Sequence, residues 1–473
     1  MVGIKLNSIC VWGSKMNIRI LHTNDVHSRF ENFSKIATKI KELKDENTLI
    51  LDAGDFNDFM RLELQGTKGR AGCKLLNIAG YDAITIGNNE GFEGIDIIES
   101  MTSTNLIPFV SCNLYKSDMS TIEGLRRSII IDRVGVKFLI IGITPLFNEF
   151  FSLSNMYATN PIEEINKELK VNNGNYNICI VLSHLGISHD FELAETIKGL
   201  DIIVGGHSHT LMDKAEVINR TIIHQSGNYG EHLGVLDIEI KDKKIIGFHG
   251  ENINVDDIAE DSEIIEELYN QKEISIVELS QPIFKIDCHI WHDIVEENPI
   301  TNLLADALVD VVSCDMSIIN SGVIIGGIRK GDVSYKKLLE ISPSPLNPTY
   351  MEIKGKYIKE ALQLSLQSEV CLQDGKGSGF RGKYLGRLHI SNAFIEHNGK
   401  EILSIKINNC EMEDEKTYRV ATSDYLRRGT GYPSLSNGFN ERYNPEYMRD
   451  VLKDYLNKKD FLEKCFTDRW RKI

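Results

Sequence analysis

The chain has 473 residues, more than one hydrophobic core usually covers, so its length predicts two or three domains. Hydrophobic residues make up 42% and charged residues 26%, which excludes a mainly disordered chain. The net charge of −15 repels a nucleic-acid backbone, and no apolar run reaches the ~18 residues of a membrane span. We therefore expect neither nucleic acid nor a membrane as a partner.

The first half of the sequence alternates apolar, strand-like runs with amphipathic helical segments. Apolar side chains recur at helical spacing in 33–45 and 160–170. This alternation predicts a layered α/β domain, which we place at residues 16–252. Its predicted strands are 17–22, 47–51, 83–86, 136–144, 177–182, 201–204, 218–224 and 233–240.

The composition changes after an acidic segment with helical periodicity at 254–280. We assign residues 253–283 to a linker helix. Short strands and Gly-rich turns follow, and they predict a second, α+β domain over 284–473. Within it we expect a strand at 316–320 and helices at 298–312, 356–368 and 444–457.

The cysteines and the first residues bear on the cellular compartment. The nine cysteines are scattered and include no C-x-x-C pair, which favours free thiols in a reducing environment. Residues 1–15 lack the continuous apolar stretch of a secretory signal. We therefore expect a cytoplasmic protein.

Five of the strand-like runs end in side chains that can bind a metal ion. A single ending of this kind can occur by chance, but chance does not readily place such residues after five successive strand-like runs. In an open α/β sheet these ends converge, and imidazole, carboxylate and amide donors together suit Zn, Mn or Fe better than Mg or Ca. The candidate ligands are Asp25, His27, Asp55, Asn88, His184, His207 and His209.

The motifs TNDVHS, DAGD, GNNE, LSHLG and GGHSH, in this order, resemble the calcineurin-like metallophosphoesterase domain of the 5′-nucleotidase family. NSGVIIGGIRKGDVS at 320–334 and YRVATSDYLRRGTGYP at 418–433 resemble the C-terminal domain of that family. The resemblance implies an α/β fold, a layered β-sandwich flanked by helices, followed by a second α+β domain that binds the substrate. It also implies a metal-dependent hydrolase of phosphate esters, with nucleotides as the expected small-molecule substrate.

The resemblance also implies roles for the ligands. Asp25, His27, Asp55 and His209 would hold one divalent ion. Asp55 would bridge to a second ion, which Asn88, His184 and His207 complete. A hydroxide held between the two ions (Mn, Zn or Fe) would then attack phosphorus.

The sequence departs from the family in the second loop, which usually reads G-N-H-E with an Asp two residues after the Glu. Here Asn89 stands in the place of the His and Phe92 in the place of the Asp. We assign Asn89 to the catalytic position, where an amide can donate a hydrogen bond but cannot deliver a proton. This leaves two alternatives open: a nucleotide phosphodiesterase or pyrophosphatase, or a nucleotide-binding module that has lost catalysis.

The resemblance further implies a substrate pocket in the second domain. Arg329 would bind phosphate or another part of the substrate, since its planar fork suits an oxyanion. Tyr425 would stack on a nucleobase, with either Phe380 or Tyr384 as the second aromatic. The G-x-G-x-x-G match at 377–382 lacks a strand–helix context, so we do not expect a dinucleotide site there.

Overall fold

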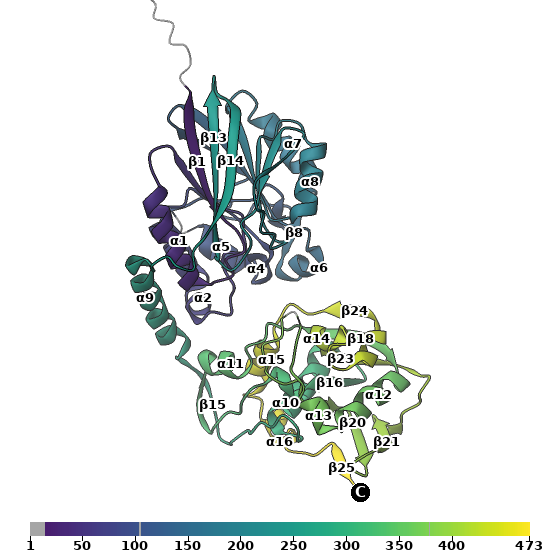
Figure 1. Cartoon of the computed structure of the whole chain (residues 1–473). Coiled ribbons are helices and arrows are strands. Elements are labelled where there is room, and N and C mark those ends of the chain that lie inside the picture. The colour runs from purple at the N-terminus through teal and green to yellow at the C-terminus, as the bar shows by residue number, and fades with distance from the viewer. Residues whose placement is uncertain (1–14, 104–105, 378) are drawn as a thin grey trace, which may run out of the picture. The chain divides into compact units, whose positions relative to one another are not determined.

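The computed structural model describes residues 15–103, 106–377 and 379–473 (Figure 1). The chain divides into two compact units, of which the first ends at Ile276 and the second spans Val277–Ile473. The division falls within α9 (Ser262–Leu279), the helix expected between the domains. The domain limits at 252 and 283 that the sequence suggests remain predictions.

The first unit contains two six-stranded sheets. One has the order β14 (Lys244–Asn254), β13 (His232–Lys241), β1 (Met16–Thr23), β2 (Thr48–Asp52), β3 (Ala83–Thr85) and β4 (Phe109–Val110). The other has the order β11 (Glu216–Ile218), β12 (Thr221–His224), β10 (Ile202–Gly205), β9 (Ile178–Ser183), β7 (Val136–Ile143) and β6 (Ser128–Arg133). Strands β1 to β4 are paired in parallel, as are β7, β9, β10 and β12.

The two sheets enclose a core of β-branched and other apolar side chains, among them Ile20, Leu49 and Ile180. Further apolar clusters join the outer face of each sheet to helices. The first sheet is covered by α1 (Phe30–Leu43), α3 (Arg70–Ala79) and α5 (Ile95–Thr102), and the second by α7 (Pro161–Val171) and α8 (Ile187–Thr196) (Figure 1). Shorter elements are α2 (Leu62–Thr67), α4 (Asn88–Phe92), α6 (Asn148–Phe151), β5 (Leu114–Lys116) and β8 (Met156–Ala158).

The predicted strand at 218–224 is instead a hairpin of β11 and β12. Asn219 and Arg220 connect the two strands, and both have positive φ, 47° and 76°. Two such residues in a row give the tight turn whose twist matches an antiparallel pair. The apolar pattern of the sequence gives no sign of this turn, because Ile218 before it and Ile222 after it look like parts of one strand.

The second unit packs its helices and sheets around a single apolar cluster. A five-stranded sheet has the order β19 (Leu388–Ser391), β16 (Met316–Asn320), β23 (Thr417–Ser423), β18 (Pro348–Lys354) and β24 (Phe439–Tyr443). A four-stranded sheet has the order β22 (Cys410–Glu411), β21 (Ile402–Ile407), β20 (Ala393–His397) and β25 (Trp470–Lys472), and β15 (Pro282–Ile286) pairs with β17 (Gly331–Ser334). The helices are α10 (Pro299–Val312), α11 (Tyr335–Ile341), α12 (Gly355–Ser365), α13 (Ser368–Cys371), α14 (Asp424–Arg427), α15 (Met448–Tyr455) and α16 (Lys459–Lys464).

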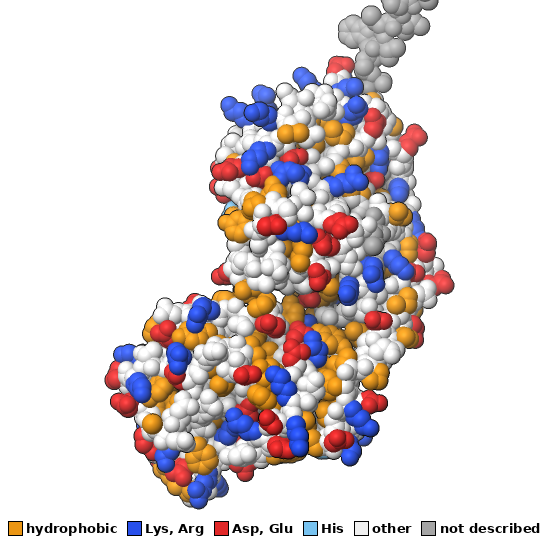
Figure 2. Space-filling view, turned by 180° about the vertical axis from the view of Figure 1, so that it is seen from behind, with side chains coloured by type: hydrophobic (Ala, Val, Ile, Leu, Met, Phe, Trp, Pro, Cys, Tyr) orange, Lys and Arg blue, Asp and Glu red, His pale blue; other side chains and the backbone are white. Residues whose placement is uncertain are grey.

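The predicted fold class, a layered β-sandwich flanked by helices and followed by an α+β domain, is confirmed. Among the described residues no helix combines the length and apolar composition that a membrane crossing requires. On the face seen in Figure 2, Lys and Arg side chains lie among Asp and Glu rather than in one basic patch. The exclusion of nucleic acid and the cytoplasmic location remain predictions.

Two histidines face each other in the interior of the first unit. His22 on β1 and His224 on β12 are both fully buried, and His22 Nε2 lies 2.8 Å from His224 Nδ1. Burial lowers the pKa of His224 to about 4, and burial followed by the nearby His224 holds the pKa of His22 well below its usual value. Both rings are therefore neutral in the folded protein at neutral pH.

This pair predicts a loss of stability in mild acid. The unfolded chain binds protons near the ordinary histidine pKa of about 6.5, whereas folded His224 does so only near 4. The contribution of His224 is therefore fully present above pH 6.5 and is lost as the pH falls toward 4, by about 2 kcal/mol between pH 7 and pH 5. Urea unfolding with chelator present, carried out at pH 7 and at pH 5, measures this difference in the free energy of unfolding.

His224→Asn keeps a polar atom near His22 and should lose less stability between the two pH values than the parent protein does. His249→Asn is the matched control, because the His249 side chain is 73% exposed and lies outside the buried pair. Equal pH dependence in His224→Asn and the parent would show that this pair does not titrate as described.

Candidate metal centre

The polar residues after five parallel strands meet at one end of the sandwich. Asp25 and His27 follow β1, Asp55 follows its neighbour β2, and Asn88 opens α4 after β3. In the other sheet, His184 follows β9, while His207 and His209 follow the adjacent β10. The convergence expected from the sequence is therefore present, because each residue stands at the carboxyl end of a central strand.

Several of these residues have unusual backbone conformations. The φ angles of Asp25, His27, Asp55, His207 and His209 are all positive, between 47° and 73°. Non-glycine residues adopt this region at an energetic cost, and such strain gathers at functional sites. The strained loops of β1 and β2 are bonded to each other, since the Asp25 N–H donates to the Gly54 carbonyl and the His27 N–H to the Asp55 carbonyl, both at 2.9 Å.

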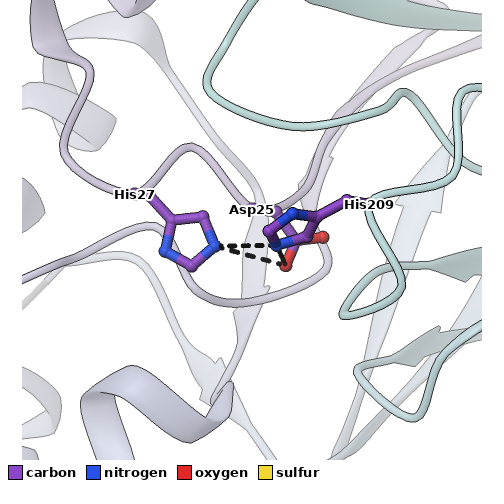
Figure 3. Close-up of side chains that lie close together, drawn as sticks. All are labelled: Asp25, His27 and His209. Atoms are coloured by element: carbon purple, nitrogen blue, oxygen red, sulfur yellow. Dashed lines mark hydrogen bonds and ion pairs between the residues drawn. The ribbon is translucent and has the colours of Figure 1, made fainter. Parts of the chain in front are cut away.

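The side chains form two groups of donor atoms that share Asp25. In the first group, Asp25 Oδ1 lies 3.7 Å from His27 Nε2 and 3.5 Å from His209 Nε2 (Figure 3). In the second, His184 Nε2 lies 3.8 Å from Asp25 Oδ1 and 3.3 Å from Asp55 Oδ2. All donor atoms within a group lie within 4.8 Å of one another, a spacing that one ion can span.

The donor set fits the divalent metal that the fold implies. Asp25 Oδ1 and His184 Nε2 are buried and have no hydrogen-bond partner among the described residues, although leaving such atoms unpaired is costly. Asn88 Oδ1 and His207 Nδ1 lie 2.8 Å apart at the same site. Both carboxylates stand between the groups, because Asp55 Oδ2 also lies 3.9 Å from His27 Nε2. The bridging role of Asp55 therefore remains a prediction, with Asp25 as an equally placed carboxylate.

Without a cation, the two buried carboxylates beside His184 favour its protonated form. Burial would raise the pKa of Asp55, but His184 and His27 outweigh it and hold that pKa at about 2. Burial would lower the pKa of His184, but Asp55 and Asp25 raise it to about 10. A metal ion that binds His184 must therefore displace this proton.

Glu90 is a positioning residue that we did not single out from the sequence, although it belongs to the GNNE motif. It is 2% exposed, and its Oε1 accepts the Asn57 N–H at 2.9 Å. Its Oε2 accepts the N–H groups of Gly87 (3.1 Å) and Asp55 (3.2 Å). One carboxylate thus binds the loop that carries Asp55 to the loop that carries Asn88.

Gly87 permits the close approach of these two loops. A Cβ atom on Gly87 would lie 2.0 Å from Asp55 Oδ1 and 2.5 Å from the Asp55 backbone nitrogen, closer than any real contact. A larger residue at position 87 would therefore displace Asp55. Only a glycine lets the backbone pass this close to the site.

The two residues that replace the family dyad have clear contacts. Asn89 Nδ2 lies 2.7 Å from His27 Nδ1. The Phe92 ring contacts Phe147, Phe150 and Phe151, with ring centroids 5.5–5.9 Å apart. Phe92 therefore belongs to an aromatic cluster and presents no polar group to Asn89.

The predicted substrate residues all lie in the second unit. Phe380 and Tyr425 stack directly on each other, with centroids 4.5 Å apart and planes at 20°. The Tyr384 ring instead lies under the Lys383 ammonium group. Arg329 is exposed, and it directly follows Ile328, which forms an isolated β-bridge with Ile290. The structure thus pairs Tyr425 with Phe380 and leaves no room for a base between the two rings in this conformation.

Comparisons with known proteins agree with the geometry. Residues 18–211 match the calcineurin-like phosphoesterase model, and residues 277–437 match the 5′-nucleotidase C-terminal domain model. A protein of Bacillus subtilis named as an uncharacterized metallophosphoesterase is 28% identical over 461 residues, which cover 93% of this chain and 98% of that protein. The 5′-nucleotidase of Mus musculus is 24% identical over 523 residues, covering 94% and 88%.

A solved structure shows the same fold. The NAD nucleotidase of Haemophilus influenzae has a TM-score of 0.65 and 17% identity, covering 94% of this chain and 96% of that chain. The two family models together match most of the sequence and occur in the order of the two structural units. The chain therefore belongs to the 5′-nucleotidase family and is a metal-dependent phosphoester hydrolase, with a calcineurin-like phosphoesterase domain followed by a 5′-nucleotidase C-terminal domain.

Proposed function

We propose that the protein is a dinuclear metal-dependent phosphatase that hydrolyses phosphate esters of nucleotides. The observation that carries this proposal is the pair of donor groups that share Asp25, in which Asp25 Oδ1 and His184 Nε2 are buried and find no hydrogen-bond partner in the described part of the chain. Two divalent ions (Mn, Zn or Fe) bound there would act as Lewis acids on the phosphoryl oxygens and supply a nucleophile at neutral pH. Asp25, His27 and His209 would hold one ion and Asn88, His184 and His207 the other, with Asp55 as the proposed bridge between them.

A cationic side chain packs on the aromatic ring that flanks the first donor group. The Arg29 guanidinium is exposed and lies over the Tyr229 ring, 5.1 Å from its centroid. That ring is in turn 5.7 Å from His27 and 5.9 Å from His209. A planar guanidinium in this position suits an incoming phosphoryl group, because it can donate two parallel hydrogen bonds to an oxyanion.

A phosphate-release screen tests the proposal. Nucleoside monophosphates, cyclic nucleotides and nucleotide sugars are incubated with the protein and Mn²⁺, Co²⁺ or Zn²⁺. We expect release from nucleotides with at least one of these metals, and its loss in Asp55→Asn, since Asp55 contacts His184 and approaches His27. Metal analysis should show two equivalents in the parent protein and about one in His209→Ala. Less than one equivalent under every loading condition would refute the dinuclear site.

The choice of nucleotides rests on the names of the two nucleotidases compared above and on the aromatic pair of the second unit. If the two rings separate to admit a base, Phe380→Ala should raise KM for a nucleotide by the equivalent of about 1–3 kcal/mol and leave hydrolysis of a small aryl phosphate unchanged. Steady-state kinetics on both substrates measure the difference. Tyr384→Ala is the matched variant, and a larger effect there would assign the second aromatic to Tyr384 instead.

A second candidate function is supported by the loop at position 89. A phosphodiesterase or pyrophosphatase needs less help for its leaving group, and no imidazole stands at Asn89 to supply a proton. Chromatography of the products from cyclic nucleotides and nucleotide sugars distinguishes this activity from that of a monoesterase, because it forms nucleoside monophosphates and releases no free phosphate.

A further inference from the structure

We propose that Asn89 is a positioning residue that orients His27 for metal binding, rather than a group that acts on the substrate. Asn89 stands in the place that a catalytic His would take in the related sequences, but its amide lies against a candidate ligand, with Nδ2 2.7 Å from His27 Nδ1. This inference rests on the proposed metal-dependent function, and it concerns what the chain does toward the metal.

The two nitrogens of His27 face different surroundings. Nε2 faces the first donor group, 3.1 Å from His209 Nε2 and 3.7 Å from Asp25 Oδ1. Nδ1 faces Asn89. An imidazole that binds an ion through Nε2 carries its proton on Nδ1, where it needs an acceptor. A half-turn of the Asn89 amide presents Oδ1 to that proton, because the planar group has an acceptor at one end and a donor at the other.

The other histidines that aim Nε2 into the site have the same arrangement. His184 Nδ1 lies 2.7 Å from the Ala53 carbonyl oxygen, which is an acceptor. His209 Nδ1 lies 3.0 Å from Asn228 Nδ2, and this amide, like that of Asn89, presents an acceptor after a half-turn. Each of these rings is thus oriented by a polar partner at Nδ1. Asn89 completes this pattern for His27, since among the described residues no other hydrogen bond reaches His27 Nδ1.

The remaining contacts of Asn89 also lead to ligands. Its backbone N–H donates to Asp55 Oδ1 at 2.8 Å. In the orientation of the structure its Oδ1 accepts from Asn88 Nδ2 at 3.1 Å, a bond that the half-turn toward His27 gives up. Asn88 in turn lies 2.8 Å from His207 Nδ1. A continuous chain of four side chains, His27, Asn89, Asn88 and His207, therefore joins the two proposed ion sites, and the Asn89 amide is occupied within it.

The test is the affinity of the chelator-treated, full-length protein for Mn²⁺, measured by titration calorimetry. Asn89→Ala removes the partner of His27 and should weaken at least one binding step by about 10–100-fold. Asn89→Asp supplies a carboxylate acceptor for both His27 and Asn88, and should bind Mn²⁺ at least as tightly as the parent. Asn166→Ala, an exposed Asn on α7 that bonds only a backbone carbonyl, should bind like the parent.

Kinetics with p-nitrophenyl phosphate separate positioning from direct action. If Asn89 only orients His27, the rate of Asn89→Ala should return toward that of the parent at saturating Mn²⁺. Unchanged Mn²⁺ affinity in Asn89→Ala, or a rate loss that persists at saturating Mn²⁺, would overturn the inference. Failure of the parent protein to bind Mn²⁺, Co²⁺ or Zn²⁺ at all would instead refute the proposed function, so the two failures can be told apart.

Discussion

An aryl phosphate such as p-nitrophenyl phosphate is expected to be hydrolysed about 10²–10⁴-fold faster than a nucleoside 5′-monophosphate at saturating metal. The reason is the absence of a proton donor at the loop of Asn89 and Phe92. A nitrophenolate departs without a proton, whereas a ribose alkoxide does not. The measurement is kcat/KM across a series of aryl and alkyl phosphates, plotted against the pKa of the leaving group.

Other histidines do not replace the missing donor in the described structure. His22 is paired with His224 in the interior, and His189 Nδ1 contacts the Leu185 carbonyl. No hydrogen bond joins His189 or His232 to a candidate ligand in the described part of the chain. A flat dependence of rate on leaving-group pKa would mean that another acid performs this step, and the argument from position 89 would be wrong.

The double variant Asn89→His and Phe92→Asp offers a gain-of-function control. It should raise the rate only for poor leaving groups, because only they need the proton. The rate should be compared at saturating Mn²⁺, since the variant also removes the Asn89 contact with His27. Its stability must be measured first, because the new carboxylate would lie among Phe147, Phe150 and Phe151, where an unpaired charge is costly.

Asp306→Ala is expected to destabilise the second unit by about 3–5 kcal/mol. The Asp306 side chain on α10 is fully buried, and its carboxylate accepts a 2.6 Å bond from Arg469 Nη2 and a 2.5 Å bond from Ser391 Oγ. The Arg469 side chain is only 7% exposed. Removal of Asp306 leaves this guanidinium buried without its counter-charge. Calorimetry of the full chain should show a melting transition lowered by about 6–20 °C.

Asp460→Ala is the matched control, because Asp460 lines the same surface cavity of about 300 Å³ but is exposed and has no ion pair among the described residues. Combining Asp306→Leu with Arg469→Met should recover much of the loss, since replacing both members of a buried pair by apolar residues is often neutral. Equal melting of Asp306→Ala and Asp460→Ala would show that the pair does not stabilise the unit.

The same contact explains why the last residues fold with the second unit. The 5′-nucleotidase C-terminal domain match ends at residue 437, yet Arg469 and β25 lie beyond it. Besides the Asp306 pair, the Glu297 carboxylate accepts the N–H groups of Arg469 and Trp470. No periodicity or motif in residues 438–473 indicates this attachment, because its partners are 163 and more positions away.

The sequence by itself determined the layered fold and the identity of the candidate ligands. Both depend on local patterns: apolar periodicity specifies the strands, and polar residues directly after parallel strands must meet at one end of the sheet. This pattern predicts that Asp25, Asp55 and His184 lie near one another, and their donor atoms do form one of the two groups of candidate metal ligands.

Only the tertiary structure decided what the side chains around those ligands do. Asn89 and His27 are 62 positions apart, and their contact depends on how the segment after β1 packs against the segment after β3. That the Tyr425 ring packs against Phe380 likewise depends on contact between segments far apart in the sequence, and which aromatic would stack on a base remains a prediction. Such contacts are set by packing between segments distant in the sequence, which spacing along the chain does not encode.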